Sequence, residues 1–402
     1  MEPLYLDHHA TTPVDPRVLE VMWPFFRERF GNASSRSHRF GSDARDAVER
    51  ARAEVSALIG GRDGHVVFTS GATESDDLAI AGTLALAGPR DHLVIAATEH
   101  PAVRGPAERF GRSGGRVTVL GVDREGRVDL DELASVVDER TALVSVGLAQ
   151  SEVGTVQDVA AVATIARARG ALVHCDAAQG LGYVPFDASA LGLDLVSASA
   201  HKIYGPKGVG ALWVRHRVRV APRLLGGGQE RGLRSGTVNV PGVVGFGAAA
   251  TILVREGAAE AERLRAMRDR CWAKLATLEA VHLHGPALDG PRPLDRVGGV
   301  SRRHPGNLHV GVEGLDGEGL LLALASKLAL SSGSACASER REPSAALQAM
   351  GIPRDRATLR FGFGRETPVD AIDDVAAFVI ETVTRLRESS PAWRLRGQAI
   401  AW

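Results

Sequence analysis

A lysine marks the segment of the chain where chemistry is easiest to envisage. Lys202 lies in Ser199-Ala-His-Lys-Ile-Tyr-Gly-Pro-Lys-Gly208, directly after the apolar run at residues 195–197. A lysine just past the end of a buried strand is desolvated, which lowers its pKa and makes it a capable imine-forming amine. On this segment alone, a loop lysine at a turn is an equally good interpretation.

Two segments upstream carry complementary chemistry. Asp176 follows an apolar run, where a carboxylate can pair with a protonated pyridine nitrogen or cap a helix. Residues 66–78 read as a strand, a turn at Gly71 and a helix start at Ala72 and Thr73. Backbone N–H groups and a hydroxyl at a helix N-terminus form a phosphate cradle. No Gly-Lys-Ser/Thr follows, so this is not a Walker A loop, and the Rossmann glycine pattern is absent too.

The order of these parts is informative. A phosphate cradle, an acid for a ring nitrogen and an imine-forming lysine are what pyridoxal 5′-phosphate needs from a protein. Each part is weak evidence by itself. Together, on an α/β pattern, they indicate this cofactor.

Cys336 stands apart from the other two cysteines. It ends Ser331-Ser-Gly-Ser-Ala-Cys336, where small residues leave the sulfur accessible. Thiolate is the reactive form, so a polar loop suits a nucleophile better than a core position does. Cys175, after an apolar strand, and Cys271, beside Trp272 in a helix, are interpreted as packing residues.

Composition narrows the class of protein. The 402 residues are 44% hydrophobic and 24% charged, as in globular proteins, and the formal charge is +0, which argues against direct nucleic-acid binding. The longest apolar stretch, residues 243–254, is shorter than the roughly 20 residues of a membrane span, and no signal peptide is read. Three cysteines far apart in sequence fit a reducing, cytoplasmic setting.

The elements that must position these side chains follow an α/β pattern. Short apolar runs alternate with helical patterns such as 159–169, and the runs are residues 66–68, 92–96, 117–120, 142–146, 171–174, 195–197 and 210–214. This alternation predicts a mostly parallel, doubly wound sheet covered on both faces. We expect a large domain at residues 14–255 and a smaller α+β domain from residues 1–13 and 256–402. A helix over about 243–278 should break or bend near Gly257.

The whole pattern resembles the cysteine desulfurases, pyridoxal-phosphate enzymes of fold type I in the class V aminotransferase superfamily, and in particular their iron–sulfur-assembly branch. The matching motifs run almost end to end: Leu6-Asp-His-His-Ala-Thr-Thr-Pro13, Ser35-Arg-Ser-His-Arg-Phe-Gly41, Thr69-Ser-Gly-Ala-Thr-Glu-Ser75, Thr98-Glu-His100, Asp176-Ala-Ala-Gln179, His201-Lys-Ile-Tyr-Gly-Pro-Lys-Gly208, Arg234-Ser-Gly-Thr237, Ser331-Ser-Gly-Ser-Ala-Cys336 and Leu359-Arg-Phe361.

The resemblance implies roles at the matching positions. Lys202 would hold the cofactor covalently, and His100 would stack on its ring and move protons. Asp176 would pair with the ring nitrogen and Gln179 with the ring hydroxyl. Arg360 would bind the substrate carboxylate, a bidentate task that suits guanidinium. The remaining family assignments are a phosphate site formed by Ala72, Thr73, Ser199 and His201 with Thr237 of the partner subunit, and Asn32 at the mouth of the site.

The reaction implied is conversion of L-cysteine to L-alanine, with the sulfur held on Cys336 as a persulfide. A homodimer would pass the sulfur to an acceptor protein, an iron–sulfur scaffold or a thiolation enzyme. No resident metal is expected, apart from a transient iron–sulfur contact through Cys336. Selenocysteine lyase, aminotransferase and non-catalytic scaffold remain as alternatives.

One departure from the family stands in the sequence. Where the family usually has two asparagines before Glu-x-Gly, this chain has Gln150-Ser-Glu-Val-Gly154. The second asparagine normally reaches cofactor and substrate, and Ser151 has only a short hydroxyl. A lost neutral hydrogen bond is worth about 0.5–1.5 kcal/mol, so we expect a weakened binding role at Ser151 within an active enzyme.

Overall fold

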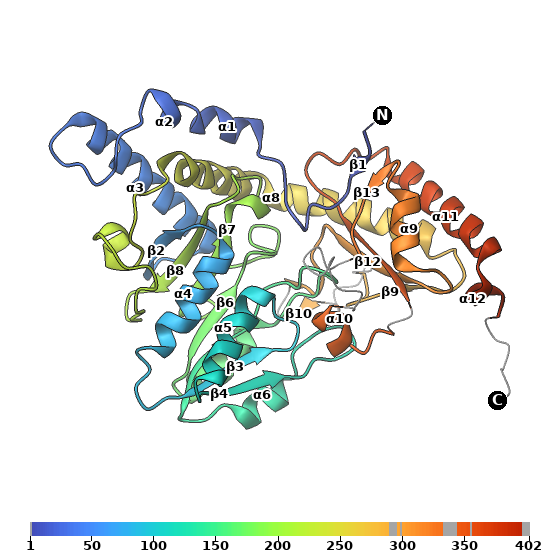
Figure 1. The fold of residues 1–402 in the computed structure, drawn as a ribbon, viewed down its shortest axis with the longest axis horizontal. Helices are drawn as coiled ribbons and strands as arrows, with labels where there is room; N and C mark the ends of the chain where they lie inside the picture. The colour runs from blue at the N-terminus through green and yellow to red at the C-terminus, as the bar shows by residue number, and fades with distance from the viewer. Residues whose placement is uncertain (1, 289–295, 298–299, 333–343, 354–355, 396–402) are drawn as a thin grey trace.

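The computed structural model describes residues 2–288, 296–297, 300–332, 344–353 and 356–395. The chain forms two bodies that lie side by side, joined by one long helix, α8 (Val240–Leu275) (Figure 1). The larger body holds a central sheet covered by helices. The smaller body holds a three-stranded sheet and the C-terminal helices.

Among the described residues, the other helices are α1 (Pro16–Met22), α2 (Pro24–Arg27), α3 (Arg39–Ile59), α4 (Ala72–Leu84), α5 (Pro101–Arg112), α6 (Leu130–Val136), α7 (Val159–Ala168), α9 (Gly317–Leu324), α10 (Ala345–Ala349), α11 (Ile372–Ser389) and α12 (Pro391–Arg394), with 3₁₀ turns η1 (Ala200–Lys202) and η2 (Gln229–Gly232). The strands are β1 (Leu4–Tyr5), β2 (Gly64–Thr69), β3 (His92–Ala96), β4 (Arg116–Leu120), β5 (Thr141–Ser145), β6 (Leu172–Asp176), β7 (Leu195–Ser199), β8 (Gly210–Arg215), β9 (Val281–Leu283), β10 (Arg296–Val297), β11 (Val300–Ser301), β12 (Asn307–Val312), β13 (Leu328–Ala329) and β14 (Ala357–Gly362).

The central sheet confirms the predicted α/β architecture. Its strand order is β2-β8-β7-β6-β5-β3-β4, and every strand predicted from an apolar run is present. β8 runs antiparallel to both of its neighbours, and the other pairs are parallel. The carboxyl ends of the parallel strands therefore meet at one edge, which is where open α/β sheets bind ligands.

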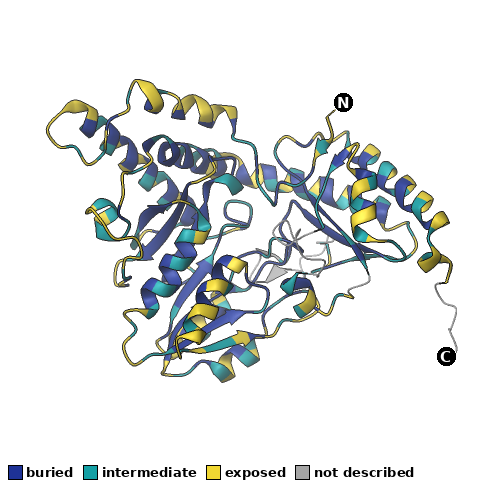
Figure 2. Ribbon diagram, in the orientation of Figure 1, coloured by how far each residue is buried: buried dark blue, intermediate teal, exposed yellow. Residues whose placement is uncertain are grey.

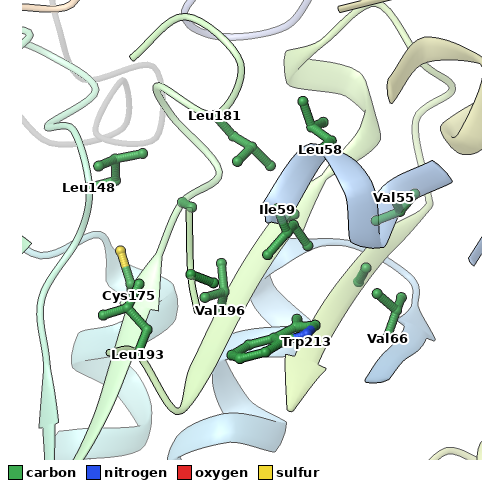
Figure 3. Packing of buried hydrophobic residues seen from close by; sticks show 14 of the residues in the cluster. Val55, Leu58, Ile59, Val66, Leu148, Cys175, Leu181, Leu193, Val196 and Trp213 are labelled. Carbon is green, nitrogen blue, oxygen red and sulfur yellow. The ribbon is translucent and has the colours of Figure 1, made fainter. Parts of the chain in front are cut away.

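Alternating apolar side chains bury both faces of this sheet. On β2, Val66 and Phe68 belong to one core cluster, and Val67 belongs to the cluster on the opposite face. In the first of these clusters Trp213 packs beside Val66 and Ile59 (Figure 3), and its indole N–H donates to Gly61 O at 3.2 Å. A two-sided core explains why these strands read as continuous apolar runs.

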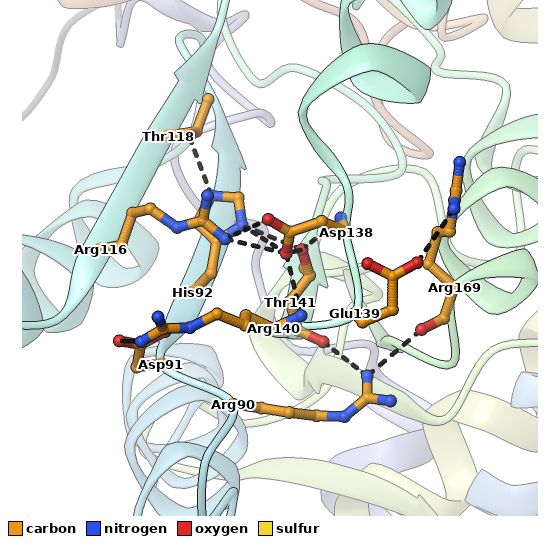
Figure 4. A network of polar contacts seen from close by, with 10 residues as sticks. All are labelled: Arg90, Asp91, His92, Arg116, Thr118, Asp138, Glu139, Arg140, Thr141 and Arg169. Carbon is orange, nitrogen blue, oxygen red and sulfur yellow. Dashed lines mark hydrogen bonds and ion pairs between the residues drawn. The ribbon is translucent and has the colours of Figure 1, made fainter.

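Polar contacts fasten the amino ends of the strands. The buried His92 ring contacts the hydroxyls of Thr141 at 2.9 Å and Thr118 at 2.8 Å, which joins β3 to β5 and β4 (Figure 4). Arg116 donates to Asp138 at 2.7 Å in the same network. This network lies at the edge where the parallel strands begin. The opposite edge, where these strands end, therefore remains available for a binding site.

The smaller body has its own core. Its antiparallel sheet has the order β14-β12-β9, and its apolar cluster takes members from the C-terminal half of α8, from β12, β14, α9 and α11, and from Leu6 near the N-terminus. β1 pairs in parallel with β13, so the N-terminal strand joins the C-terminal part of the chain. These separate cores support our proposal that residues 14–255 form one domain and residues 1–13 and 256–402 the other. Dark, buried strands lie inside each body in Figure 2.

The prediction of a break near Gly257 is wrong, since α8 continues as a helix through this residue. Gly257 is buried, and a Cβ there would lie 2.5 Å from the backbone oxygen of Gly182. The glycine thus serves close packing against a loop and does not interrupt the helix. By length and composition α8 could cross a membrane, but 56% of its most apolar 18-residue stretch is buried inside the protein, as in core helices.

Candidate active site

A cavity of about 700 Å³ lies at the carboxyl edge of the central sheet, where the smaller body closes over it. Ten of the site residues expected from the sequence line this cavity: Ala72, Thr73, His100, Ser151, Asp176, Gln179, Ser199, His201, Lys202 and Arg360. They come from segments almost 300 residues apart, and the fold brings them together.

Lys202 is held at the end of β7 by the N-terminal segment. Its amine donates to the backbone oxygens of His9 and Ala10, the latter at 2.9 Å. Gln179 also donates to His9 O, at 2.8 Å. The segment around His9 therefore forms one wall of the cavity and aligns two of the expected cofactor contacts.

Asp176 belongs to a buried group of polar side chains. His174, two residues earlier on β6 and so on the same face, contacts Ser145 Oγ at 2.8 Å and Ser197 Oγ at 2.9 Å. The carboxyl of Asp76, from α4, lies 3.5 Å from His174 Nε2 and is fully buried.

Burial raises the pKa of Asp76 well above its usual value, and the Asp176 carboxylate adds to this. Burial also raises the pKa of Asp176, while the backbone N–H of Ala178, at 2.9 Å, and the nearby His100 and Lys202 favour its charged form. Asp176 is therefore the carboxyl of the pair that is best placed to carry charge opposite a cationic ring nitrogen.

His100 and Glu99 follow β3. Ala102 N donates to His100 Nδ1 at 3.1 Å, so the neutral imidazole carries its proton on Nε2. Burial lowers the pKa of His100, although Asp176 acts in the opposite direction. Burial raises the pKa of Glu99 to about 8, and Asp176 adds to that rise although Gly147 N donates to the carboxyl at 2.9 Å. Glu99 is therefore mostly protonated at neutral pH.

The start of α4 has the features of a phosphate cradle. Gly71 caps the helix without a side-chain contact, and Ala72 and Thr73, whose first-turn N–H groups have no acceptor within the helix, line the cavity. β8 closes tightly behind this turn, because a Cβ on Gly210 would lie 2.5 Å from Gly71 Cα. Burial lowers the pKa of His201 to about 4, which leaves a neutral ring beside the cradle.

Arg360 extends from β14 into the other side of the cavity. Its guanidinium donates to Asp7 Oδ1 at 2.6 Å and to Ser151 O at 3.2 Å. The neighbouring Glu152 is buried, which raises its pKa to about 7, and it accepts a hydrogen bond from Ser344 Oγ at 2.6 Å. Gln150 accepts the N–H groups of Glu152 and Val153, both at 2.7 Å, so its side-chain oxygen is used within the turn.

These residues fit pyridoxal phosphate. Exposed helix N–H groups suit its phosphate, Asp176 suits its ring nitrogen, and a lysine amine suits its aldehyde. The volume is within the range of small-molecule sites. Within the described residues, no group of three or more His, Cys, Asp or Glu is placed to hold a metal ion.

Two of the expected residues do not line this cavity. Asn32 is exposed and turns its side-chain oxygen to Ser34 N at 2.9 Å. Thr237 is exposed and does not line the cavity, although Arg234 of the same motif pairs with the cavity residue Glu74 at 2.8 Å. Cys336 lies outside the described residues.

The structure adds residues to which no role was given from the sequence: Asp7, His9, Asp76, Glu99 and Glu152. The sequence pattern could have pointed to Asp76. It shares a helical face with Ala79, Ile80 and Thr83, which are all buried, so a charged residue stood on an apolar face. No comparable periodicity marks Asp7.

Comparison with known proteins gives the family. The profile of the family described as aminotransferase class-V matches residues 4–375. The chain is 48% identical over 399 residues to "Cysteine desulfurase IscS" of Anaeromyxobacter sp. (strain Fw109-5), covering 98% of this chain and 95% of that protein. It is 44% identical to the protein of the same name from Escherichia coli O9:H4 (strain HS), with 99% and 97% covered.

A solved structure titled "NIFS-LIKE PROTEIN" superposes with a TM-score of 0.84 at 34% identity, covering 96% of this chain and 99% of that one. Sequence, fold and cavity agree, and the chain therefore belongs to the class-V aminotransferase family, among its pyridoxal-phosphate-dependent cysteine desulfurases.

Proposed function

We propose that this chain removes sulfur from L-cysteine, leaving L-alanine and a persulfide on Cys336, and passes that sulfur to an acceptor protein. The observation that carries the proposal is that Lys202, Asp176, His100 and Arg360 line one cavity. Bound pyridoxal phosphate supplies an electron sink that stabilises negative charge at the substrate Cα.

Lys202 and His100 are the groups that would move protons. Lys202 is placed by two backbone oxygens, and we propose that its amine takes the Cα proton of the substrate and later returns one. His100 presents Nε2 to the site, because Nδ1 is occupied by Ala102 N. Arg360 would hold the substrate carboxylate from the opposite wall.

The described residues on both sides of Cys336 support its role. On the N-terminal side, Ser331 Oγ donates to Asp7 at 3.1 Å, and Thr358 Oγ1 donates to Ser332 O at 2.9 Å. On the C-terminal side, Ser344 lines the cavity and donates to Glu152. In the proposed step the Cβ–S bond of the substrate breaks, an S–S bond forms to Cys336, and a proton completes the methyl group of alanine.

The proposal is tested by supplying L-cysteine and a reductant to the purified holoenzyme and measuring alanine and sulfide. Equimolar release is the expected result. Parallel reactions with L-selenocysteine, and with L-alanine plus a 2-oxo acid, test the lyase and aminotransferase alternatives. Amino-group transfer without sulfide would refute the proposal, and a chain that binds no pyridoxal phosphate would be a scaffold.

We predict that Ser151→Asn improves the affinity for L-cysteine or for the cofactor by about threefold to tenfold, the value of one neutral hydrogen bond. Ser151 lines the cavity, and the side-chain oxygen of Gln150 is used in its own turn, so that oxygen does not replace an amide at position 151. Steady-state kinetics and cofactor titration measure the effect. Ser151→Ala is the control, since it adds no amide and should give no gain. A clear loss of activity in Ser151→Asn would show that the site is rebuilt around serine.

A homodimer forms part of the proposal. Thr237 and Asn32, assigned to the site by family resemblance, are both exposed and outside this chain's own cavity, as residues that serve a neighbouring subunit would be. α1, α2, the start of α3 and the segments that connect them carry a set of exposed large apolar side chains: Leu19, Val21, Trp23, Phe26, Phe30 and Phe40. These helices show as exposed in Figure 2. An apolar patch of this kind marks an interaction surface.

Light scattering of the active holoenzyme should therefore give twice the mass of one chain. Trp23→Asp, which places a charge in the patch, should shift the mass towards one chain and weaken cofactor retention, because the phosphate site would lose Thr237 of the partner subunit. A single-chain mass with full activity in the unmodified protein would contradict the dimer.

The acceptor and the location are finer points of the same proposal. An iron–sulfur scaffold or a thiolation enzyme would take the sulfur, with any iron–sulfur contact through Cys336 transient. A cytoplasmic location suits a chain whose described cysteines, Cys175 and Cys271, are both buried and free of disulfides. Trapping of persulfide-accepting proteins from a cytoplasmic extract, with Cys336→Ala as control, would identify the acceptor.

A further inference from the structure

An aspartate from the start of the chain pairs with the arginine assigned to the substrate carboxylate. Asp7 Oδ1 lies 2.6 Å from Arg360 Nη2, and the two side chains are 17% and 3% exposed. The residues are far apart in sequence but close in the fold, since Asp7 bridges to Gly362 on β14 and Gly362 N donates to Leu6 O at 2.7 Å. Backbone contacts between the N-terminal segment and β14 therefore bring the two side chains together.

A guanidinium as buried as that of Arg360 needs an anion nearby, because an uncompensated buried charge is costly. Asp7 supplies that charge before substrate binds. The guanidinium of arginine is planar, so a contact at Nη2 helps to set the orientation of that plane. The second contact, from Nη1 to Ser151 O at 3.2 Å, fixes the other end of the fork.

Asp7 also contacts the segment that leads to Cys336. Ser331 Oγ donates to the same oxygen, Asp7 Oδ1, at 3.1 Å, and Arg360 N donates to Ser331 O at 2.7 Å. The backbone of Asp7 is held as well, since Tyr5 Oη donates to Asp7 O at 3.0 Å. One carboxylate thus joins the substrate arginine to the residue five positions before the proposed nucleophile.

We propose that Asp7 is a positioning residue for substrate recognition, which orients Arg360 towards the carboxylate of the amino-acid substrate and holds it beside Ser331. The inference rests on the proposed function of Arg360. It assigns to the N-terminal segment a part in selecting substrates that carry a carboxylate next to the amine.

The experiment compares two ligands in the holoenzyme. For Asp7→Asn we expect KM for L-cysteine to rise about tenfold while kcat stays within about threefold, since ground-state orientation is lost and the proton-moving groups remain. Cysteamine has the amine and thiol but no carboxylate. Its binding, followed by the change in the cofactor's absorption, should be equal in Asp7→Asn and the unmodified enzyme.

Two further variants separate positioning from general damage. Asp194→Asn is the matched control. Asp194 is a fully buried aspartate that pairs with Arg217 at 3.0 Å, and it lies before the start of β7, whereas Lys202 follows the end of that strand. Asp194→Asn should leave KM for L-cysteine unchanged. Asp7→Glu keeps the negative charge, so its KM for L-cysteine should be close to that of the unmodified enzyme. This variant is used for the comparison if Asp7→Asn does not fold. In an Arg360→Lys background, Asp7→Asn should add less than twofold to KM.

Equal KM values for Asp7→Asn and the unmodified enzyme would overturn the inference, as would equal losses for L-cysteine and cysteamine. Failure of the proposed function gives a different result. If the unmodified holoenzyme releases no sulfide from L-cysteine, the role of Asp7 is still read from absorption changes with L-alanine, which has the carboxylate, against ethylamine, which lacks it. A selective loss for L-alanine in Asp7→Asn would support the inference even then.

Discussion

Replacement of Lys202 by alanine will lower the release of alanine and sulfide from L-cysteine by about 10²–10⁴-fold or more. The loss is large because one amine would both hold the cofactor and move the Cα proton. Lys202 is the lysine placed for this, at the end of β7 and held by the oxygens of His9 and Ala10. Activity assays and the cofactor's visible absorption measure both consequences.

Borohydride reduction followed by peptide mapping gives the assignment directly, with the pyridoxyl group expected on Lys202. Lys207 also lines the cavity, but it is exposed and its amine lies 3.4 Å from Thr12 O. A label on Lys207 would contradict the assignment. Lys274→Ala serves as the control, because Lys274 lies on α8 and pairs with Asp373 at 3.1 Å, outside the cavity.

The parts that could be predicted from the sequence are those with a local signal. The strands of the central sheet are apolar runs bounded by turn residues, and each was found within a few residues of its expected place. Lys202, Asp176 and the cradle at Ala72 each follow such a run. Since parallel strands end at one edge, their meeting in a single cavity followed from the fold class.

The remaining site residues depend on contacts without a local signal. Asp7 meets Arg360 across 353 residues, through a bridge between the N-terminal segment and β14, and no periodicity in either segment encodes that pairing. Gly257 looked like a helix breaker because glycine lowers helix propensity, but tertiary packing against Gly182 outweighed that preference. Glu152 had no signal either, since its pKa near 7 arises from burial against the smaller body.

Cys336→Ala will retain the cofactor's absorption and the spectral change on adding L-cysteine, yet will release sulfide at a rate lower by about 10³-fold or more. The spectral change and the sulfide release should respond differently because they depend on different residues. Cofactor and substrate contacts come from Lys202, Asp176 and Arg360, which the substitution leaves in place, whereas breaking the Cβ–S bond needs a thiolate to accept the sulfur. Stopped-flow absorption and a sulfide assay under reductant measure the two halves separately.

Cys271→Ala is the matched control. Burial raises the pKa of Cys271 to about 12, so its thiol stays protonated inside the smaller body and its loss should leave sulfide release unchanged. Cys175 is held protonated in the same way, because burial raises its pKa well above the usual value and the nearby acidic side chains of Asp176, Glu99 and Asp76 add to that rise. Neither described cysteine is therefore placed to replace Cys336. Near-normal sulfide release from Cys336→Ala would mean that sulfur leaves without an enzyme thiol, and the persulfide step would have to be abandoned while the cofactor site stands.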